Sequence, residues 1–175
     1  MTVQELLEFR RRKDAFFASP QSPLPESARS NFGGLGYFDF NPELVFQLSL
    51  QPLQDVQHVM LETSNGVRKS YVKAGTLEFA LAGQALNLTA YSNPESENPE
   101  LFIPFRDATN GKQTYASGRY LDPELSTDGT VLLDFNLAYH PYCAYSDGWS
   151  CPIPPLENWL KVPILAGEIL AEATL

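Results

Sequence analysis

Short alternating segments bounded by turn residues restrict the fold of this chain more than any other feature of its sequence. Between residues 44 and 91, apolar and polar side chains alternate over short runs, as they do on strands with one buried face. Asn65 and Gly66 lie between two such runs, and an Asn-Gly pair suits the positive φ angles of a two-residue hairpin turn. A second turn at residues 82–84 joins two further runs. The pattern predicts a β-meander.

One helix is expected, at the N-terminus. Thr2 and Glu5 have the spacing of a capping box, and apolar residues follow at helical spacing through residues 1–19. Three prolines bar helix from the linker at residues 20–31, and residues 32–175 form the β domain. The chain is therefore predicted to be a single domain that is mainly β, an antiparallel β-sandwich or barrel-like meander with one N-terminal α-helix.

The charge and hydropathy of the chain exclude several classes of partner. The formal net charge of −9 disfavours nucleic acid, because phosphate would approach a field of its own sign. The sequence has no apolar run of membrane-spanning length and no signal peptide, which predicts a cytoplasmic protein with no membrane partner. Because that compartment keeps thiols reduced, Cys143 and Cys151 are expected as free thiols or metal ligands, not as a disulfide. Nothing indicates a cofactor or an oligomeric state.

A tract from residue 105 onward concentrates arginines, carboxylates and aromatic rings among prolines. Arg106, Lys112 and Arg119 bring three cations into fourteen residues of an acidic protein, and guanidinium groups bind carboxylate or phosphate in a planar fork. Nearby rings would supply the walls of a small-molecule pocket. The tract predicts a site for a small anionic or polar metabolite. Its candidate residues are Arg106, Asp107, Lys112, Tyr115, Arg119, Asp134, Asn136, Tyr139, Cys143, Glu157 and Asn158.

Three alternatives stay open. The same charges suit a buried ion-pair network that ties loops onto the sheet, and the sequence favours this network slightly over a ligand site. A hydrolase or transferase would use Asp107, Glu157 or Cys143, and an interaction module would need no small-molecule site at all. The structure separates the first alternative from a ligand site by whether Arg106 and Arg119 face a cavity or packed carboxylates.

The histidine and cysteines suggest chemistry that their spacing does not favour. His140, Cys143, Cys151 and Asp147 together offer a tetrahedral zinc shell, but zinc sites usually present two close pairs, and these cysteines are eight residues apart. No metal is predicted. Cys143 beside His140, with Asp134 or Asp147 behind the ring, would make a nucleophile and base, although nearness in sequence does not establish that geometry.

The second half of the chain resembles a bacterial family classified only as domain of unknown function 1684. The resemblance rests on residues 105–115, 118–121, 133–139, 143–145, 151–158 and 166–168. It implies no activity, because the family has none established. His140 departs from the asparagine that the resemblance leads us to expect, so a role for this histidine would be private to this chain.

Overall fold

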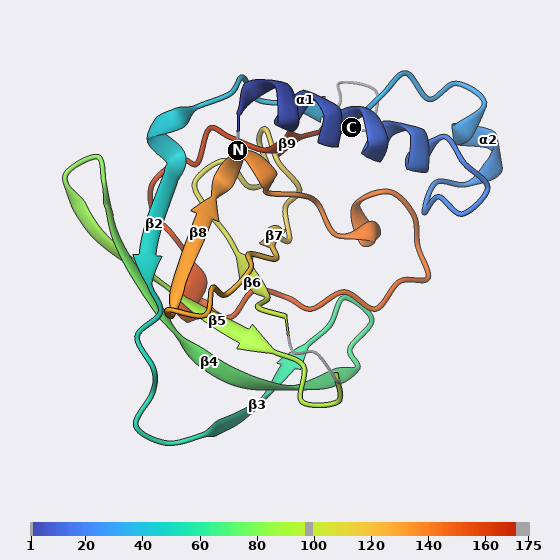
Figure 1. The fold of residues 1–175 in the computed structure, drawn as a ribbon. Coiled ribbons are helices and arrows are strands. Elements are labelled where there is room, and N and C mark those ends of the chain that lie inside the picture. The colour runs from blue at the N-terminus through green and yellow to red at the C-terminus, as the bar shows by residue number, and fades with distance from the viewer. Residues whose placement is uncertain (1, 97–99, 171–175) are drawn as a thin grey trace.

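The computed structural model describes residues 2–96 and 100–170, and strands predominate in it (Figure 1). Helix α1 (Val3–Phe17) begins at Thr2, whose side chain accepts a hydrogen bond from the backbone N–H of Glu5 while the Glu5 carboxylate accepts one from the backbone N–H of Thr2. The predicted capping box is therefore present. No helix in the described ranges has the length and apolar character needed to cross a membrane.

The linker that follows contains a helical turn that the sequence did not predict. Helix α2 (Glu26–Arg29) begins after Pro25, which occupies the N-cap position. A proline disrupts a helix where its ring and missing N–H would interrupt the hydrogen bonds between successive turns. At the start of a helix the backbone N–H groups have no partner within the helix, so a proline is tolerated there. The prolines of residues 20–31 therefore place this short helix and do not exclude it.

Antiparallel pairs make up the strand architecture, as predicted for the sheet-rich class, but the described strands do not close into a barrel. Four sheets have the orders β1-β9, β2-β8, β3-β4-β5 and β6-β7. The strands are β1 (Gly36–Tyr37), β2 (Val45–Ser49), β3 (Gln57–Glu62), β4 (Arg68–Leu81), β5 (Gln84–Ser92), β6 (Ile103–Phe105), β7 (Arg119–Leu121), β8 (Thr130–Asp134) and β9 (Glu168–Ile169).

Both predicted hairpins form, β3–β4 and β4–β5, but the two-residue turn occurs in the second hairpin and not in the first. At the β3–β4 turn only Gly66 has positive φ, +78°, so residues 64–66 make a three-residue loop and not the two-residue turn expected from Asn-Gly. The two-residue turn occurs between β4 and β5, where Ala82 and Gly83 have φ of 50° and 74° and Leu81 pairs with Gln84. Thr63 explains the first result, because its hydroxyl donates to the carbonyl of Val67 and favours the longer loop.

The apolar core lies between the sheets and a C-terminal segment that is extended without being a strand. Inward side chains of β4, β5, β6 and β8 form one cluster with the segment at residues 160–166. In that segment the alternate residues Leu160, Val162, Ile164 and Ala166 are buried while those between them are exposed. Backbone hydrogen bonds to residues 106–108 reach only as far as Val162, so side chains must satisfy part of the backbone beyond it.

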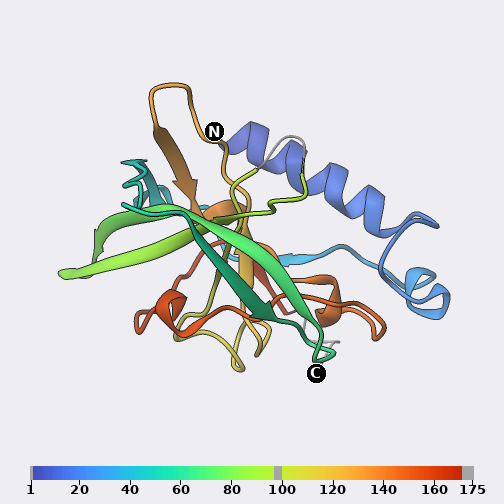
Figure 2. The same ribbon diagram turned by 90° about the horizontal axis from the view of Figure 1, so that it is seen from below.

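Helix α1 lies across one side of the strands (Figures 1 and 2). Its buried residues are Leu6 and Phe17, and the Phe17 ring meets the Tyr145 ring edge-on with centroids 4.8 Å apart. Lys13, on the same helix, pairs with Glu168 of β9. The helix is therefore held by apolar contacts, by this ion pair to β9 and by two hydrogen bonds to the backbone of residues 35–38.

Candidate functional site

Arg119 is the most buried large side chain of the predicted site, with no solvent exposure. It projects from β7, and its guanidinium donates to Asp107 Oδ2 at 2.7 Å. Three backbone carbonyls accept its remaining hydrogen bonds: Ile164 at 2.8 Å, Ala166 at 2.5 Å and Glu168 at 3.2 Å. Burial lowers the pKa of Arg119 and the nearby Asp107 carboxylate opposes that effect. The guanidinium faces packed carboxylate and backbone, not a cavity.

Asp107 completes the same network from the other side. Its Oδ1 accepts the backbone N–H of Thr109 at 2.7 Å and that of Ile164 at 3.4 Å. Arg119 and Asp107 together thus serve both backbone groups of Ile164, as a neighbouring strand would. Neither carboxylate oxygen is left for a reacting group.

Glu168 links this network to helix α1. Its Oε1 lies 2.6 Å from Lys13 Nζ, and its Oε2 accepts the backbone N–H of His140 at 2.7 Å and the hydroxyl of Tyr145 at 2.9 Å. The residue is 1% exposed, so its charge requires these partners. The helix is therefore tethered to a carboxylate that Arg119 holds through the backbone.

Two buried amides join segments that are distant in sequence. Asn136 exchanges two hydrogen bonds with the backbone of Asn41, at 2.8 and 2.9 Å. Asn158 bonds to both backbone groups of Thr89 and to the carbonyl of Pro104. Both side chains have their hydrogen-bonding groups occupied within the protein.

Asp134 and Asn136 do not lie on one strand. Strand β8 ends at Asp134, whose Oδ1 accepts the backbone N–H of Asn136 at 2.9 Å and so caps the 3-10 helix at Phe135–Leu137. Aspartate competes for nearby backbone donors in this way, which ends the strand at Asp134 although the apolar residues continue beyond it.

The remaining charged candidates are half-buried or exposed. The Arg106 guanidinium stacks over the Trp159 ring, 4.3 Å from its centroid. Glu157 accepts from Lys73 at 2.8 Å and from the Tyr91 hydroxyl at 2.6 Å. Lys112 is exposed, and half-buried Tyr115 contributes its backbone N–H to His140.

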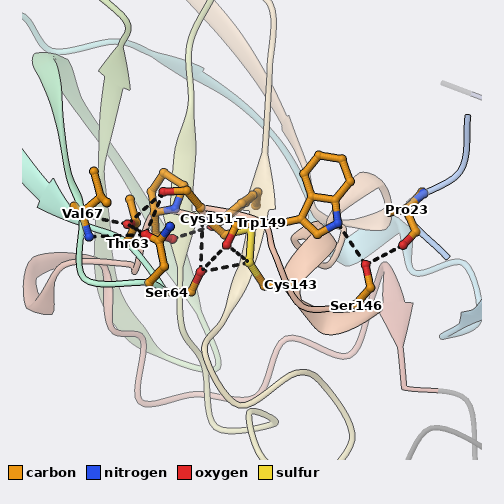
Figure 3. The surroundings of a disulfide bond; sticks show 12 residues. Pro23, Thr63, Ser64, Val67, Cys143, Ser146, Trp149 and Cys151 are labelled. Carbon is orange, nitrogen blue, oxygen red and sulfur yellow. Dashed lines mark hydrogen bonds between the residues drawn. A yellow bond between two sulfur atoms is a disulfide. The ribbon is translucent and has the colours of Figure 1, made fainter. Parts of the chain in front are cut away.

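Cys143 and Cys151 form a disulfide, which corrects the expectation of free thiols (Figure 3). The described residues contain no unpaired cysteine. His140 is also unsuited to act as a base for Cys143. It is 1% exposed, its Nε2 accepts the backbone N–H of Tyr115 at 3.2 Å, and burial, with the positive charges of Arg119 and Lys13, lowers its pKa to about 3.

A groove of about 810 Å³ lies between helix α1 and the strand body. Among the eleven predicted site residues, Tyr139 lines it, and within the described part of the chain the other ten do not. Most of the lining is aromatic or otherwise apolar. The lining residues are Phe9, Arg12, Lys13, Phe16, Phe17, Tyr120, Asp122, Tyr139, Pro141, Tyr142, Trp149, Ser150, Cys151 and Pro152.

Polar groups are few in the groove and most are already engaged. Tyr139 donates to Asp122 Oδ2 at 2.6 Å, and burial together with that carboxylate raises the pKa of the Tyr139 phenol, which stays protonated. Lys13 Nζ lies 4.6 Å above the Tyr139 ring while it pairs with Glu168. Arg12 differs, because it is exposed and its side chain makes no ion pair or hydrogen bond with any residue that the structure describes.

Sequence reasoning missed the contribution of α1 to this groove. Phe9, Arg12 and Phe16 recur at helical spacing, which places them on one face of the helix. The basic run at residues 10–13 reads as a solvated face, and nothing in the sequence shows that this face meets the aromatic tract. The sequence signal that could have indicated the groove is the pair of aromatic residues, Phe9 and Phe16, on either side of the basic run.

Replacement of Arg119 by alanine should lower the free energy of unfolding by about 3–5 kcal/mol, because the buried Asp107 charge loses its cationic partner and three buried carbonyls lose a donor. Arg106→Ala removes a surface cation–π contact and should cost about 0.5–1 kcal/mol. Urea unfolding of both variants measures the difference. Equal losses for the two variants would contradict the assignment of Arg119 to the core.

The buried neutral state of His140 should make folding weaken in acid. Its pKa of about 3 in the folded protein lies below the value of about 6.5 in an unfolded chain, so the unfolded state binds the extra proton between these values. The contribution is fully present above pH 6.5 and is lost as the pH falls toward 3, by up to about 1.4 kcal/mol per pH unit.

His140→Asn removes this titration and should flatten the dependence of unfolding free energy on pH over that window. Urea unfolding of the two proteins at a series of pH values measures it. Parallel curves for the two proteins would show that His140 is not held neutral.

Comparisons with known proteins identify the family of this chain but give no activity for it. A family model described as "Protein of unknown function (DUF1684)" matches residues 30–169. The chain is also similar to an uncharacterised protein of Haloarcula marismortui whose solution NMR structure is known, with 43% identity, 95% of this chain and 92% of that chain covered, and a TM-score of 0.73. No curated protein matches. The chain therefore belongs to the family of proteins of unknown function DUF1684.

Proposed function

We propose that the groove beside α1 binds a small molecule with an apolar or aromatic body and one anionic group. The observation that carries this proposal is the position of Arg12, an unpaired guanidinium at the edge of a groove walled by rings. Aromatic walls with few polar groups are typical of small-molecule sites, and an unpaired guanidinium is suited to a carboxylate or phosphate. The proposed ligand is still a small anionic metabolite, as the sequence predicts. The residues proposed to bind it are now Arg12 and the aromatic residues of the groove.

The aromatic walls suit a flat or extended body. Tyr142 and Trp149 meet edge-on with centroids 4.8 Å apart, and Tyr120 and Tyr139 do so at 5.7 Å. Such pairs hold their rings in fixed orientations, which reduces the entropy lost when a ligand packs against them. The ligand body is therefore proposed to lie along α1 between these two pairs.

The carboxylate of Asp122 limits the choice of anion. The surrounding protein desolvates this carboxylate and raises its pKa, although the residue keeps access to solvent and its hydrogen bond from Tyr139 acts in the opposite direction. A ligand with a single negative charge, placed toward Arg12, avoids repulsion from Asp122. A ligand hydroxyl or amine near Asp122 would find an acceptor there.

The enzyme alternative has less support from the geometry. Asp107 and Glu157 are engaged by neighbouring donors, and Cys143 is in a disulfide. Nucleic acid as a partner is disfavoured by the net charge of −9. The sequence predicts a cytoplasmic location. In the cytoplasm reducing agents keep most thiols reduced, so a lasting disulfide between Cys143 and Cys151 would be unusual there.

A direct test uses 8-anilinonaphthalene-1-sulfonate, an aromatic anion whose emission rises on transfer to an apolar site. The dye should bind the folded protein, and Arg12→Ala should weaken binding about tenfold, because a hydrogen bond to a charged group contributes about 1.5–3 kcal/mol. Displacement of the dye by aryl carboxylates and by medium-chain fatty acids would then rank ligand bodies.

Arg11→Ala is the matched control, since Arg11 lies on the same helix but outside the groove and pairs with Glu8. This dye also binds partly unfolded proteins, so both variants must keep the melting temperature of the parent. Equal dye affinity in the Arg11 and Arg12 variants would refute the groove as an anion site.

A further inference from the structure

The disulfide forms part of the groove wall. It closes the loop at residues 143–151, and three residues of that loop, Trp149, Ser150 and Cys151, line the groove. Tyr142, next to Cys143, lines it as well and contacts the Trp149 ring. The covalent link therefore joins the two ends of one aromatic wall.

Hydrogen bonds also restrain this loop, at its end and at its middle (Figure 3). The carbonyl of Cys151 accepts the backbone N–H of Ser64 at 2.9 Å, and Ser64 Oγ donates to the carbonyl of Trp149 at 3.1 Å. The Trp149 indole N–H donates to Ser146 Oγ at 3.0 Å, and Ser146 Oγ donates to the carbonyl of Pro23 at 2.6 Å. The disulfide is the covalent restraint on the loop, so its loss leaves the segment that carries Trp149 held by hydrogen bonds alone.

The surroundings of the sulfur atoms suit thiol–disulfide exchange. Both cysteines are half-buried, and Cys151 faces the groove. Ser64 Oγ lies 3.0 Å from Cys143 Sγ and 3.1 Å from the carbonyl of Trp149, so one hydroxyl proton serves either acceptor. A thiolate is the stronger acceptor of the two, so Cys143 is the sulfur better able to leave with a negative charge.

We propose that Cys143–Cys151 is a reversible redox site that sets the affinity of the groove, an inference that rests on the proposed function. A dithiol reductant attacks Cys151 Sγ as a thiolate, the Cys143–Cys151 bond breaks, and its electron pair passes to Cys143 Sγ. The second thiol of the reductant, as a thiolate, then attacks the mixed disulfide at the reductant's own sulfur. Cys151 is released as a thiolate, both cysteine sulfurs take protons, and the reductant leaves as a cyclic disulfide.

Reduction then weakens ligand binding because the Trp149 side of the wall loses its covalent link to the Tyr142 side and keeps only its hydrogen bonds. A ligand in the reduced protein must itself order the freed aromatic side chain, and the cost of that ordering corresponds to about a three- to tenfold loss of affinity. Linkage requires the reverse effect as well: a ligand that prefers the oxidised protein makes reduction less favourable.

The experiment measures dye affinity in the oxidised full-length protein, after reduction with dithiothreitol, and after reoxidation. We expect a three- to tenfold loss on reduction, its recovery on reoxidation, and slower alkylation of the cysteines when dye is present. Cys143→Ser/Cys151→Ser should match the reduced protein. Hydrogen exchange of residues 143–151 should rise on reduction while that of β4 and β5 does not.

The outcomes separate the two proposals. Equal dye affinity in both redox states, with dye bound, overturns the redox site and leaves the proposed function standing. If the dye binds in neither redox state, the proposed function is refuted, and so is the proposed redox control of the groove. Unchanged exchange of residues 143–151 on reduction also overturns the inference, because the wall would then not depend on the disulfide.

Discussion

The buried guanidinium of Arg119 is the constraint on which the rest of this structure depends. A charge without solvent exposure must find partners, and Arg119 finds Asp107 together with three carbonyls of the C-terminal segment. That segment is buried in alternation like a strand, but its backbone hydrogen bonds to residues 106–108 reach only as far as Val162. The Arg119–Asp107 pair supplies the donors and acceptor that a neighbouring strand would provide. An ion pair here replaces part of a β-ladder.

The same network determines where helix α1 lies. Once the C-terminal segment is fixed, Glu168 is buried at its end with a charge that Lys13 of α1 neutralises at 2.6 Å. The helix is thereby held beside Tyr139, and the groove is the space left between its ring-bearing face and the aromatic tract. The charged residues that first suggested a ligand site do not line this groove, and its unpaired cation, Arg12, comes from the helix.

Local patterns in the sequence predict the fold well where a few neighbouring residues decide it. The Thr2–Glu5 capping box and the two glycine-bearing turns are such cases, and α1 and both hairpins form. The site is less predictable, because the sequence around Arg119 and Asp107 would be the same whether these residues bound a ligand or each other. Which of the two they do depends on the burial of residues 160–168, far along the chain. The cysteine prediction was wrong for a related reason, since it relied on compartment and not on the loop geometry that brings residues 143 and 151 together.

The buried network anchors α1 through Lys13. Hydrogen exchange of α1 in Lys13→Met and in Arg12→Met tests this anchoring, because each variant removes one cation from the same helical turn and, of the two residues, Lys13 contacts Glu168. We expect faster exchange throughout α1 in Lys13→Met, with β5 and β8 still protected, and little change in Arg12→Met. Equal protection of α1 in the two variants would contradict it.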